Sequence, residues 1–158
     1  MEQELRIKSF NELSVPELYD ALYLRAKVFV EEQGCPYLDL DYVDQKSLHC
    51  MLYEDGKLVA YARVIPAGVQ HDDVSIGRVV TSKPGQGYGY KIFSAAMDAA
   101  KEVFKAKRIE ITSQVYIMHF YEYFGFHATS EEFVMEFRPH ITMVWEEKKS
   151  ENRTVPSF

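Results

Sequence analysis

Three glycines at alternate positions, Gly85, Gly87 and Gly89, lie between a predicted strand and the most regular predicted helix of the chain. Glycine allows a ligand to approach the backbone closely, and the N–H groups and dipole at a helix N-terminus attract an anion. This spacing therefore favours phosphate binding, although tight turns also use glycine. The run lacks the Gly-Lys-Ser/Thr of a P-loop and lies past the middle of the chain, which disfavours nucleoside triphosphates and NAD.

Four side chains are candidates for a general base, because burial can move the pKa of a carboxylate or an imidazole toward neutral pH. They are Glu32, His49, His119 and His140. The sequence does not choose among them. His140 is equally explained as a structural histidine of a strand.

Arg25 interrupts the apolar stripe of the first predicted helix, where a buried charge needs a partner. One interpretation places it in an acceptor pocket with Glu32 and His140. The other is an internal ion-pair network with Asp39 or Asp41. A concentration of acids in this region favours a cationic acceptor, although an acidic loop is usually just solvated. These acids are Glu31, Glu32, Asp39, Asp41 and Asp44.

Several local signals define the elements that must position these residues. Ser14 and Glu17 form a capping box for a helix that we expect to reach about Glu32, and Asp55-Gly56 marks the tip of a β-hairpin. Gly77 interrupts the alternation of a strand, which indicates a bulge. The remaining periodicities predict a strand at 5–10, hairpin strands at 48–53 and 58–65, strands at 73–81, 108–112, 126–136 and 140–145, and helices at 88–104 and 118–123.

This order of elements implies an α+β (mixed α/β) protein with one mixed sheet of about six to seven strands flanked by helices. We expect a single domain over residues 1–146 and a flexible tail over 147–158, which is charged and contains Pro156.

Composition excludes several classes of protein. The formal net charge of -6 argues against a nucleic-acid surface, and no apolar run is long enough to cross a bilayer. The acidic N-terminus does not resemble a secretory signal, so we expect a cytoplasmic protein. Cys35 and Cys50 have no metal-type spacing and are expected to be buried thiols, and we expect no metal.

Two motifs resemble those of the GNAT N-acetyltransferases. Pro84-Gly85-Gln86-Gly87-Tyr88-Gly89 is similar to their motif A, and Phe120-Tyr121-Glu122-Tyr123-Phe124-Gly125-Phe126 is similar to their motif B. Further segments resemble the bacterial ElaA-like branch, among them Cys35-Pro36-Tyr37, Gly77-Arg78-Val79-Val80 and Pro139-His140-Ile141. The resemblance covers about Leu18 to Met143.

The resemblance implies the GNAT fold and direct transfer of an acetyl group from acetyl-CoA to an amine. Tyr121 aligns with the usual general acid of the family. The residues implied in cofactor binding are Val79, Val80 and Thr81 for the pantetheine, Gly85, Gln86, Gly87, Tyr88 and Gly89 for the pyrophosphate, and Gln114, Phe120 and Phe124. Pro84 replaces the Arg or Gln that usually opens motif A and has no N–H to donate, although Lys83 is close enough in sequence to add charge.

The leading hypothesis is therefore an acetyl-CoA-dependent N-acetyltransferase whose acceptor is a primary amine of a small molecule or peptide. The alternatives are a non-catalytic acyl-CoA-binding or sensing module on the same fold and a mononucleotide-phosphate binder. We expect no nucleic-acid or membrane partner, and a homodimer is one option for the oligomeric state.

Overall fold

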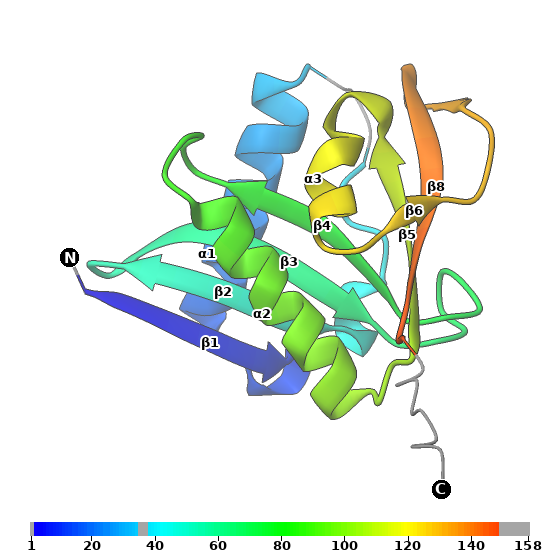
Figure 1. The fold of residues 1–158 in the computed structure, drawn as a ribbon. Helices are drawn as coiled ribbons and strands as arrows, with labels where there is room; N and C mark the ends of the chain where they lie inside the picture. The colour runs from blue at the N-terminus through cyan, green and yellow to red at the C-terminus, as the bar shows by residue number, and fades with distance from the viewer. Residues whose placement is uncertain (1, 35–37, 149–158) are drawn as a thin grey trace, which may run out of the picture.

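The computed structural model describes residues 2–34 and 38–148, so Cys35 and the predicted tail from residue 149 lie outside the described residues. The described residues form two sheets of four strands each (Figure 1). The first has the order β1-β2-β3-β4; the second has the order β5-β8-β6, with β7 paired to β8. The first sheet consists of β1 (Gln3–Ser9), β2 (Leu48–Glu54), β3 (Lys57–Ile65) and β4 (Ser75–Thr81). The second consists of β5 (Arg108–Gln114), β6 (His127–Ala128), β7 (Phe133–Met135) and β8 (Arg138–Glu146).

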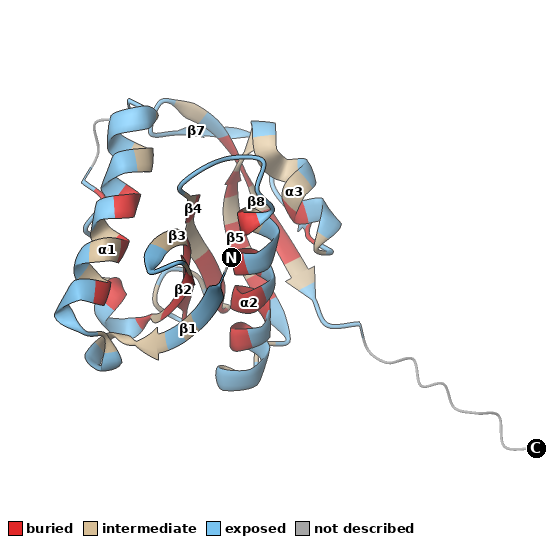
Figure 2. Cartoon of the chain, turned by 90° about the vertical axis from the view of Figure 1, so that its left-hand side faces the viewer, coloured by how far each residue is buried: buried red, intermediate tan, exposed pale blue. Residues whose placement is uncertain are grey.

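Helices cover both faces of the first sheet. Helix α1 (Val15–Arg25) continues as a π-helical segment, Ala26–Glu32, and packs on one face, while α2 (Tyr88–Val103) packs on the other (Figure 2). Helix α3 (Met118–Tyr123) adjoins the N-terminal end of α2 (Figure 1). Short 3-10 turns occur at Phe10–Glu12, Asp44–Lys46 and Val115–Ile117.

Consecutive residues of β2 are buried because α1 and α2 cover the two faces of the sheet. Cys50 and Leu52 belong to the core under α2, and Met51 and Tyr53 belong to the core under α1. Successive side chains of a strand point to opposite faces, so a strand covered on both faces buries an unbroken run of residues. The expectation of a buried Cys50 is confirmed.

The capping box is present at the start of α1. The Ser14 hydroxyl accepts a hydrogen bond from the N–H of Glu17 at 3.1 Å, and the Glu17 carboxylate accepts one from the N–H of Ser14 at 2.8 Å. The hairpin turn has positive φ at both Asp55 (50°) and Gly56 (80°), as a type I′ turn requires. Both the predicted capping box and the predicted hairpin turn are confirmed. Each depends only on residues that are close together in the sequence.

Two expectations about the sheet are corrected. The single strand expected at 126–136 is two short strands, β6 and β7, separated by residues 129–132. The single sheet is two sheets, joined by one parallel bridge between Val74 and Ile109 and a hydrogen bond of 3.0 Å from the Glu110 N–H to the Val74 carbonyl. The sheet therefore splits between β4 and β5.

Candidate active site

The split between β4 and β5 opens a cleft. Strand β4 pairs with β3, and β5 pairs with β8, while the facing edges of β4 and β5 meet only near Val74. A cavity of about 320 Å³ lies between them and is lined by β4 from Ile76 to Thr81 and by β5 from Ile111 to Gln114. Unpaired strand edges of this kind can bond to an extended ligand, as an added strand does.

A β-bulge shapes the β4 wall of the cleft. Tyr61 is opposite Val80 and Arg63 is opposite Gly77, so Arg78 and Val79 together face Ala62. Arg78 has a φ of 51°, which is uncommon for a residue with a Cβ. The bulge expected around Gly77 is thus present one residue further along.

Tyr121 lies in the cleft wall with 8% of its surface exposed. Its ring packs edge-on against Phe93, with ring centroids 5.1 Å apart, and its hydroxyl forms no hydrogen bond within the described part of the chain. Burial raises the pKa of Tyr121 to about 12. The phenol is therefore protonated at neutral pH, which a proton donor requires.

His140 is the one base candidate that lines the same cavity. It is 5% exposed, and its Nδ1–H donates a hydrogen bond of 2.8 Å to the carbonyl of Arg138. A carbonyl only accepts, so the proton of the neutral ring is on Nδ1 and Nε2 keeps its lone pair. Phe133 stacks on the ring with a centroid distance of 6.3 Å, which holds its orientation.

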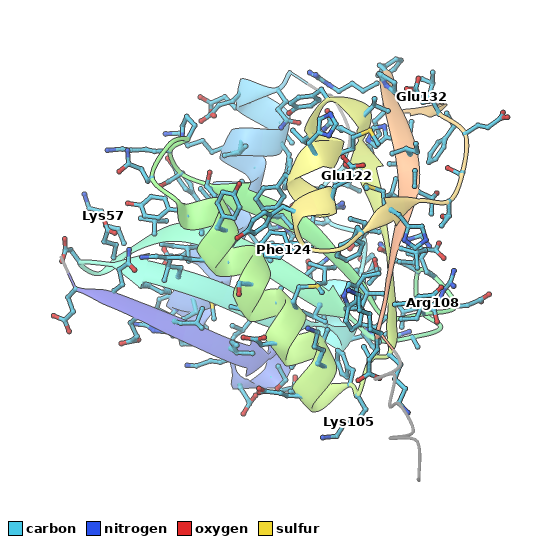
Figure 3. The ribbon with its side chains drawn as sticks, viewed as in Figure 1. Lys57, Lys105, Arg108, Glu122, Phe124 and Glu132 are labelled. Carbon is cyan, nitrogen blue, oxygen red and sulfur yellow. The ribbon has the colours of Figure 1, made fainter. Side chains whose placement is uncertain are left out.

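The other base candidates lie elsewhere. Glu32 lines a second cavity of about 410 Å³, together with Lys27, Lys57 and Lys83. His119 has a side chain that is 90% exposed and pairs with Glu122 on the outer face of α3 (Figure 3).

His49 is buried within the first sheet. Its Nδ1 accepts from the Tyr61 hydroxyl at 2.7 Å, and its Nε2–H donates to the Asp44 carbonyl at 2.9 Å. Burial lowers the pKa of His49 below its ordinary value, so the ring is neutral in a structural role.

Arg25 does not share a pocket with Glu32 and His140, which corrects one of its two interpretations. It is 1% exposed, and its guanidinium pairs with Asp39 at 2.9 Å and Asp44 at 2.8 Å. The internal network is the arrangement found: Arg25 pairs directly with the expected Asp39 and also with Asp44, and Asp41 joins the network through Arg63 and Arg78.

The same network contains two more arginines. Arg63 pairs with Asp41 at 2.6 Å and with Asp44 at 2.9 Å. Arg78 pairs with Asp39 at 2.7 Å and with Asp41 at 3.4 Å. Three guanidinium groups thus balance three carboxylates, and the acids of this loop contribute no net charge toward an acceptor.

The glycine loop leads directly into α2. Gly85 and Gly87 both have φ of 77°, a Cβ at either position would meet nothing within 4 Å, and Gly87 is the N-cap of the helix. No side chain caps this N-terminus, so its first-turn N–H groups are available to an anion. These observations fit a pyrophosphate held by the backbone.

The other residues implied in cofactor binding differ in whether their side chains line the cleft. Val79, Val80, Thr81 and Gln114 line the cleft, and the Gln114 Oε1 is buried without a hydrogen-bond partner in the described structure. Tyr88 instead donates from its hydroxyl to Glu54 at 2.8 Å.

Aromatic packing joins α3 to the start of α2. Phe124, which is labelled in Figure 3, lies at the end of α3. It packs on Phe93 with ring centroids 4.8 Å apart, and Phe120 lies 3.6 Å from where a Cβ on Gly89 would be. Phe120 and Phe124 therefore fix how α3, and with it Tyr121, sits beside the glycine loop.

Sequence reasoning missed part of the cleft. Gln33, Tyr116, Glu136 and Arg138 also line it. The sequence did not single out Tyr116, Glu136 or Arg138, although Glu136 and Arg138 lie within four positions of the candidate His140.

Comparison with known proteins identifies the family. The family described as Acetyltransferase (GNAT) domain matches residues 26–147. A UPF0039 protein of Schizosaccharomyces pombe is 42% identical over 144 residues, which cover 89% of this chain and 95% of the relative. The ElaA protein of Escherichia coli is 35% identical over 140 residues, which cover 86% of this chain and 92% of ElaA.

Two solved structures are similar over nearly their whole length. An acyl-CoA N-acyltransferase from Pseudomonas aeruginosa has a TM-score of 0.86 at 34% identity, with 91% of this chain and 99% of that chain covered. The Escherichia coli ElaA structure has a TM-score of 0.85 at 34% identity, with 92% and 100% covered.

The chain therefore belongs to the GNAT acetyltransferase family. Within that family it is an ElaA-like protein, as its motifs suggested. The chain is therefore a member of an acyltransferase family that uses acyl-CoA.

None of the helices formed by residues 2–34 and 38–148 is long and apolar enough to traverse a bilayer. Within those same ranges, no three His, Cys, Asp or Glu side chains gather as metal ligands would.

Proposed function

We propose that the chain is an N-acetyltransferase that transfers the acetyl group of acetyl-CoA directly to a primary amine of a small molecule or peptide. The observation that carries this proposal is that a buried proton donor, Tyr121, and a buried proton acceptor, His140, line one cleft. Transfer to an amine needs both, because the attacking nitrogen must lose a proton and the departing thiolate must gain one.

The donor would extend from the glycine loop into the cleft. The backbone N–H groups of Gly85 to Gly89 would hold its pyrophosphate, and the open edge of β4 from Val79 to Thr81 would bond its pantetheine amides. Gln114 offers a buried amide oxygen to an N–H group of the ligand. When bound, acetyl-CoA supplies an acetyl group activated as a thioester.

The side chains of His140 and Tyr121 would carry out the two proton transfers. His140 Nε2 removes a proton from the acceptor amine, since its Nδ1 is already committed as a donor to Arg138. Tyr121 Oη donates its proton on the leaving-group side, since burial keeps the phenol protonated. Burial of both groups also excludes water that would compete with the amine.

The test is to incubate the protein with acetyl-CoA and a panel of amines, measure CoA release, and identify each product by mass spectrometry. Calorimetry measures acetyl-CoA binding separately. Amine-dependent release with an N-acetylated product supports the proposal. Tight binding of acetyl-CoA without turnover on any amine would contradict it and favour the alternative of a non-catalytic acyl-CoA sensor.

A further inference from the structure

An aromatic cluster lies beside the N-terminus of α2. Tyr90, in the first turn of α2, has its ring centroid 5.2 Å from that of Phe120 and 5.2 Å from that of Tyr123, both on α3 (Figure 1). The ring centroid of Phe124 lies 6.0 Å from that of Tyr90 and 4.8 Å from that of the buried Phe93. The cluster therefore connects the start of α2 to the hydrophobic core.

Two rings of this cluster are exposed to solvent. Tyr90 is 49% exposed and Tyr123 is 72% exposed, whereas their neighbours Phe120 and Phe124 are half-buried. A single exposed apolar side chain is common on protein surfaces, but adjoining exposed rings that packed neighbours hold in place are typical of binding surfaces. We refer to the exposed rings of Tyr90 and Tyr123 as the aromatic platform.

Helix geometry brings the aromatic platform next to the glycine loop. The Cα–Cβ bonds of an α-helix tilt toward its N-terminus, so a side chain in the first turn covers the surface at the start of the helix. Gly87 is the N-cap of α2, and Tyr90 belongs to its first turn. Phe120, which packs on Tyr90, lies 3.6 Å from where a Cβ on Gly89 would be. The platform therefore adjoins the backbone N–H groups that fit a pyrophosphate.

The structure of acyl-CoA determines which part of the donor can reach these rings. Its pyrophosphate joins a pantetheine arm to an adenosine arm, so the two arms leave the glycine loop in different directions. The pantetheine arm would follow Val79 to Thr81 into the cleft. The adenosine arm then lies outside the cleft, with one ribose between its base and the pyrophosphate. Tyr88 is 7% exposed and presents no open ring, whereas the platform does.

We propose that the aromatic platform binds the adenine base of the acyl-CoA donor, with the base stacked on Tyr90 and alongside Tyr123. Adenine is flat and aromatic, and stacking on a tyrosine ring needs neither a charge nor a hydrogen bond. Packing against Phe120 already holds the Tyr90 ring, so little side-chain freedom is lost on binding. The inference rests on the part of the proposed function that places the pyrophosphate at the glycine loop.

The experiment measures by calorimetry the binding of CoA, dephospho-CoA and 4′-phosphopantetheine, of which only the first two contain adenine. Tyr90→Leu should weaken the binding of both CoA and dephospho-CoA by about 5- to 100-fold, because a stacked base is lost. The affinity for 4′-phosphopantetheine should change by less than about twofold, since it has no base to stack. Tyr90→Phe keeps the ring and should bind all three ligands within about twofold of the wild type.

Two further variants separate recognition from folding. Tyr123→Leu changes the more exposed ring of the platform, so it should keep the wild-type Tm and still lose affinity for CoA and dephospho-CoA but not for 4′-phosphopantetheine. Tyr19→Leu is the matched control, because Tyr19 is 71% exposed on α1, which packs on the other face of the first sheet. This control should leave all three affinities unchanged.

Several results would overturn the inference. The first is an unchanged CoA affinity in Tyr90→Leu. The second is an equal loss for CoA and 4′-phosphopantetheine, which would mean that the ring only shapes the glycine loop. The third is a loss for CoA but not for dephospho-CoA, which would assign the contact to the 3′-phosphate. If Tyr90→Leu does not fold, the same comparisons in Tyr123→Leu decide. Because every arm measures binding, a wild-type protein that acetylates none of the amines would overturn the proposed function without altering these results.

Discussion

Replacing Asp44 with asparagine tests whether the buried charge network holds the fold together. Asp44 Oδ1 accepts a hydrogen bond from Arg25 Nη1 at 2.8 Å and another from Arg63 Nη1 at 2.9 Å. Both guanidinium groups are 1% exposed. An amide oxygen in the same place can still accept both bonds, so Asp44→Asn removes charge while nearly preserving shape.

The expected cost follows from the charge balance. The network of three arginines and three aspartates becomes net positive by one charge, in a place where water cannot solvate it. Removing one partner of a buried ion pair costs about 3–5 kcal/mol. We expect the lower end, about 3 kcal/mol, because the hydrogen bonds survive. For a chain of this size that loss lowers Tm by roughly 6–12 °C.

Urea unfolding followed by circular dichroism measures the loss. The control is Asp73→Asn, which breaks the exposed Asp73–Arg108 pair of 2.9 Å and should cost less than about 0.5 kcal/mol. A cost for Asp44→Asn below about 1 kcal/mol, or one equal to the control, would refute the view that the network is a tightly coupled buried unit.

Three further predictions concern acid stability, catalysis and packing. Burial acts to raise the pKa of Asp41 and Glu17, but bonds from Arg63 to Asp41 and from Ser14 and Lys8 to Glu17 outweigh it and lower both values to about 2. Their stabilisation is therefore complete above their ordinary pKa near 4 and is lost as pH falls toward 2, so an unchanged urea midpoint between pH 5 and pH 2.5 would contradict this. Tyr121→Phe should lower kcat by about 10²-fold or more while calorimetry finds acetyl-CoA affinity within twofold of wild type, and unchanged turnover would remove its role as the acid. Gly125→Ala should destabilise the protein by about 1–3 kcal/mol in thermal unfolding, since Gly125 has φ of 94° and the new Cβ would lie 3.1 Å from Trp145; an unaltered Tm would show that α3 can shift.

Local signals allowed much of the fold to be predicted. The hairpin around Asp55-Gly56, the capping box at Ser14 and the glycine loop before α2 each depend on residues a few positions apart. The motif around Tyr121 likewise predicted a short helix that ends before Gly125. Such features need no knowledge of tertiary contacts.

The acceptor side of the site could not be predicted in the same way. The interpretation that places Glu32 in one pocket with Arg25 assumes a regular helix of 3.6 residues per turn. The segment Ala26–Glu32 is π-helical, with a bond of 3.1 Å from the Gln33 N–H to the Val28 carbonyl, five residues back. This wider turn changes which side chains share a face and leaves Glu32 in the second cavity.

The choice of partners also depends on long-range packing. The sequence offered several aspartates for Arg25, and only the folded loop brings Asp39 and Asp44 to it. The split between β4 and β5 is likewise invisible locally, because each strand has an ordinary pattern and only their pairing is lost after Val74.

The facing edges of β4 and β5 also bear on self-association. An unpaired strand edge normally invites another polypeptide to extend the sheet, which leads to aggregation. Here the two edges face one another across a cavity of about 320 Å³. That space accommodates a slender ligand but not a second sheet. The unpaired backbone N–H and C=O groups of β4 and β5 can therefore form hydrogen bonds with a small ligand, but not with a strand of another protein.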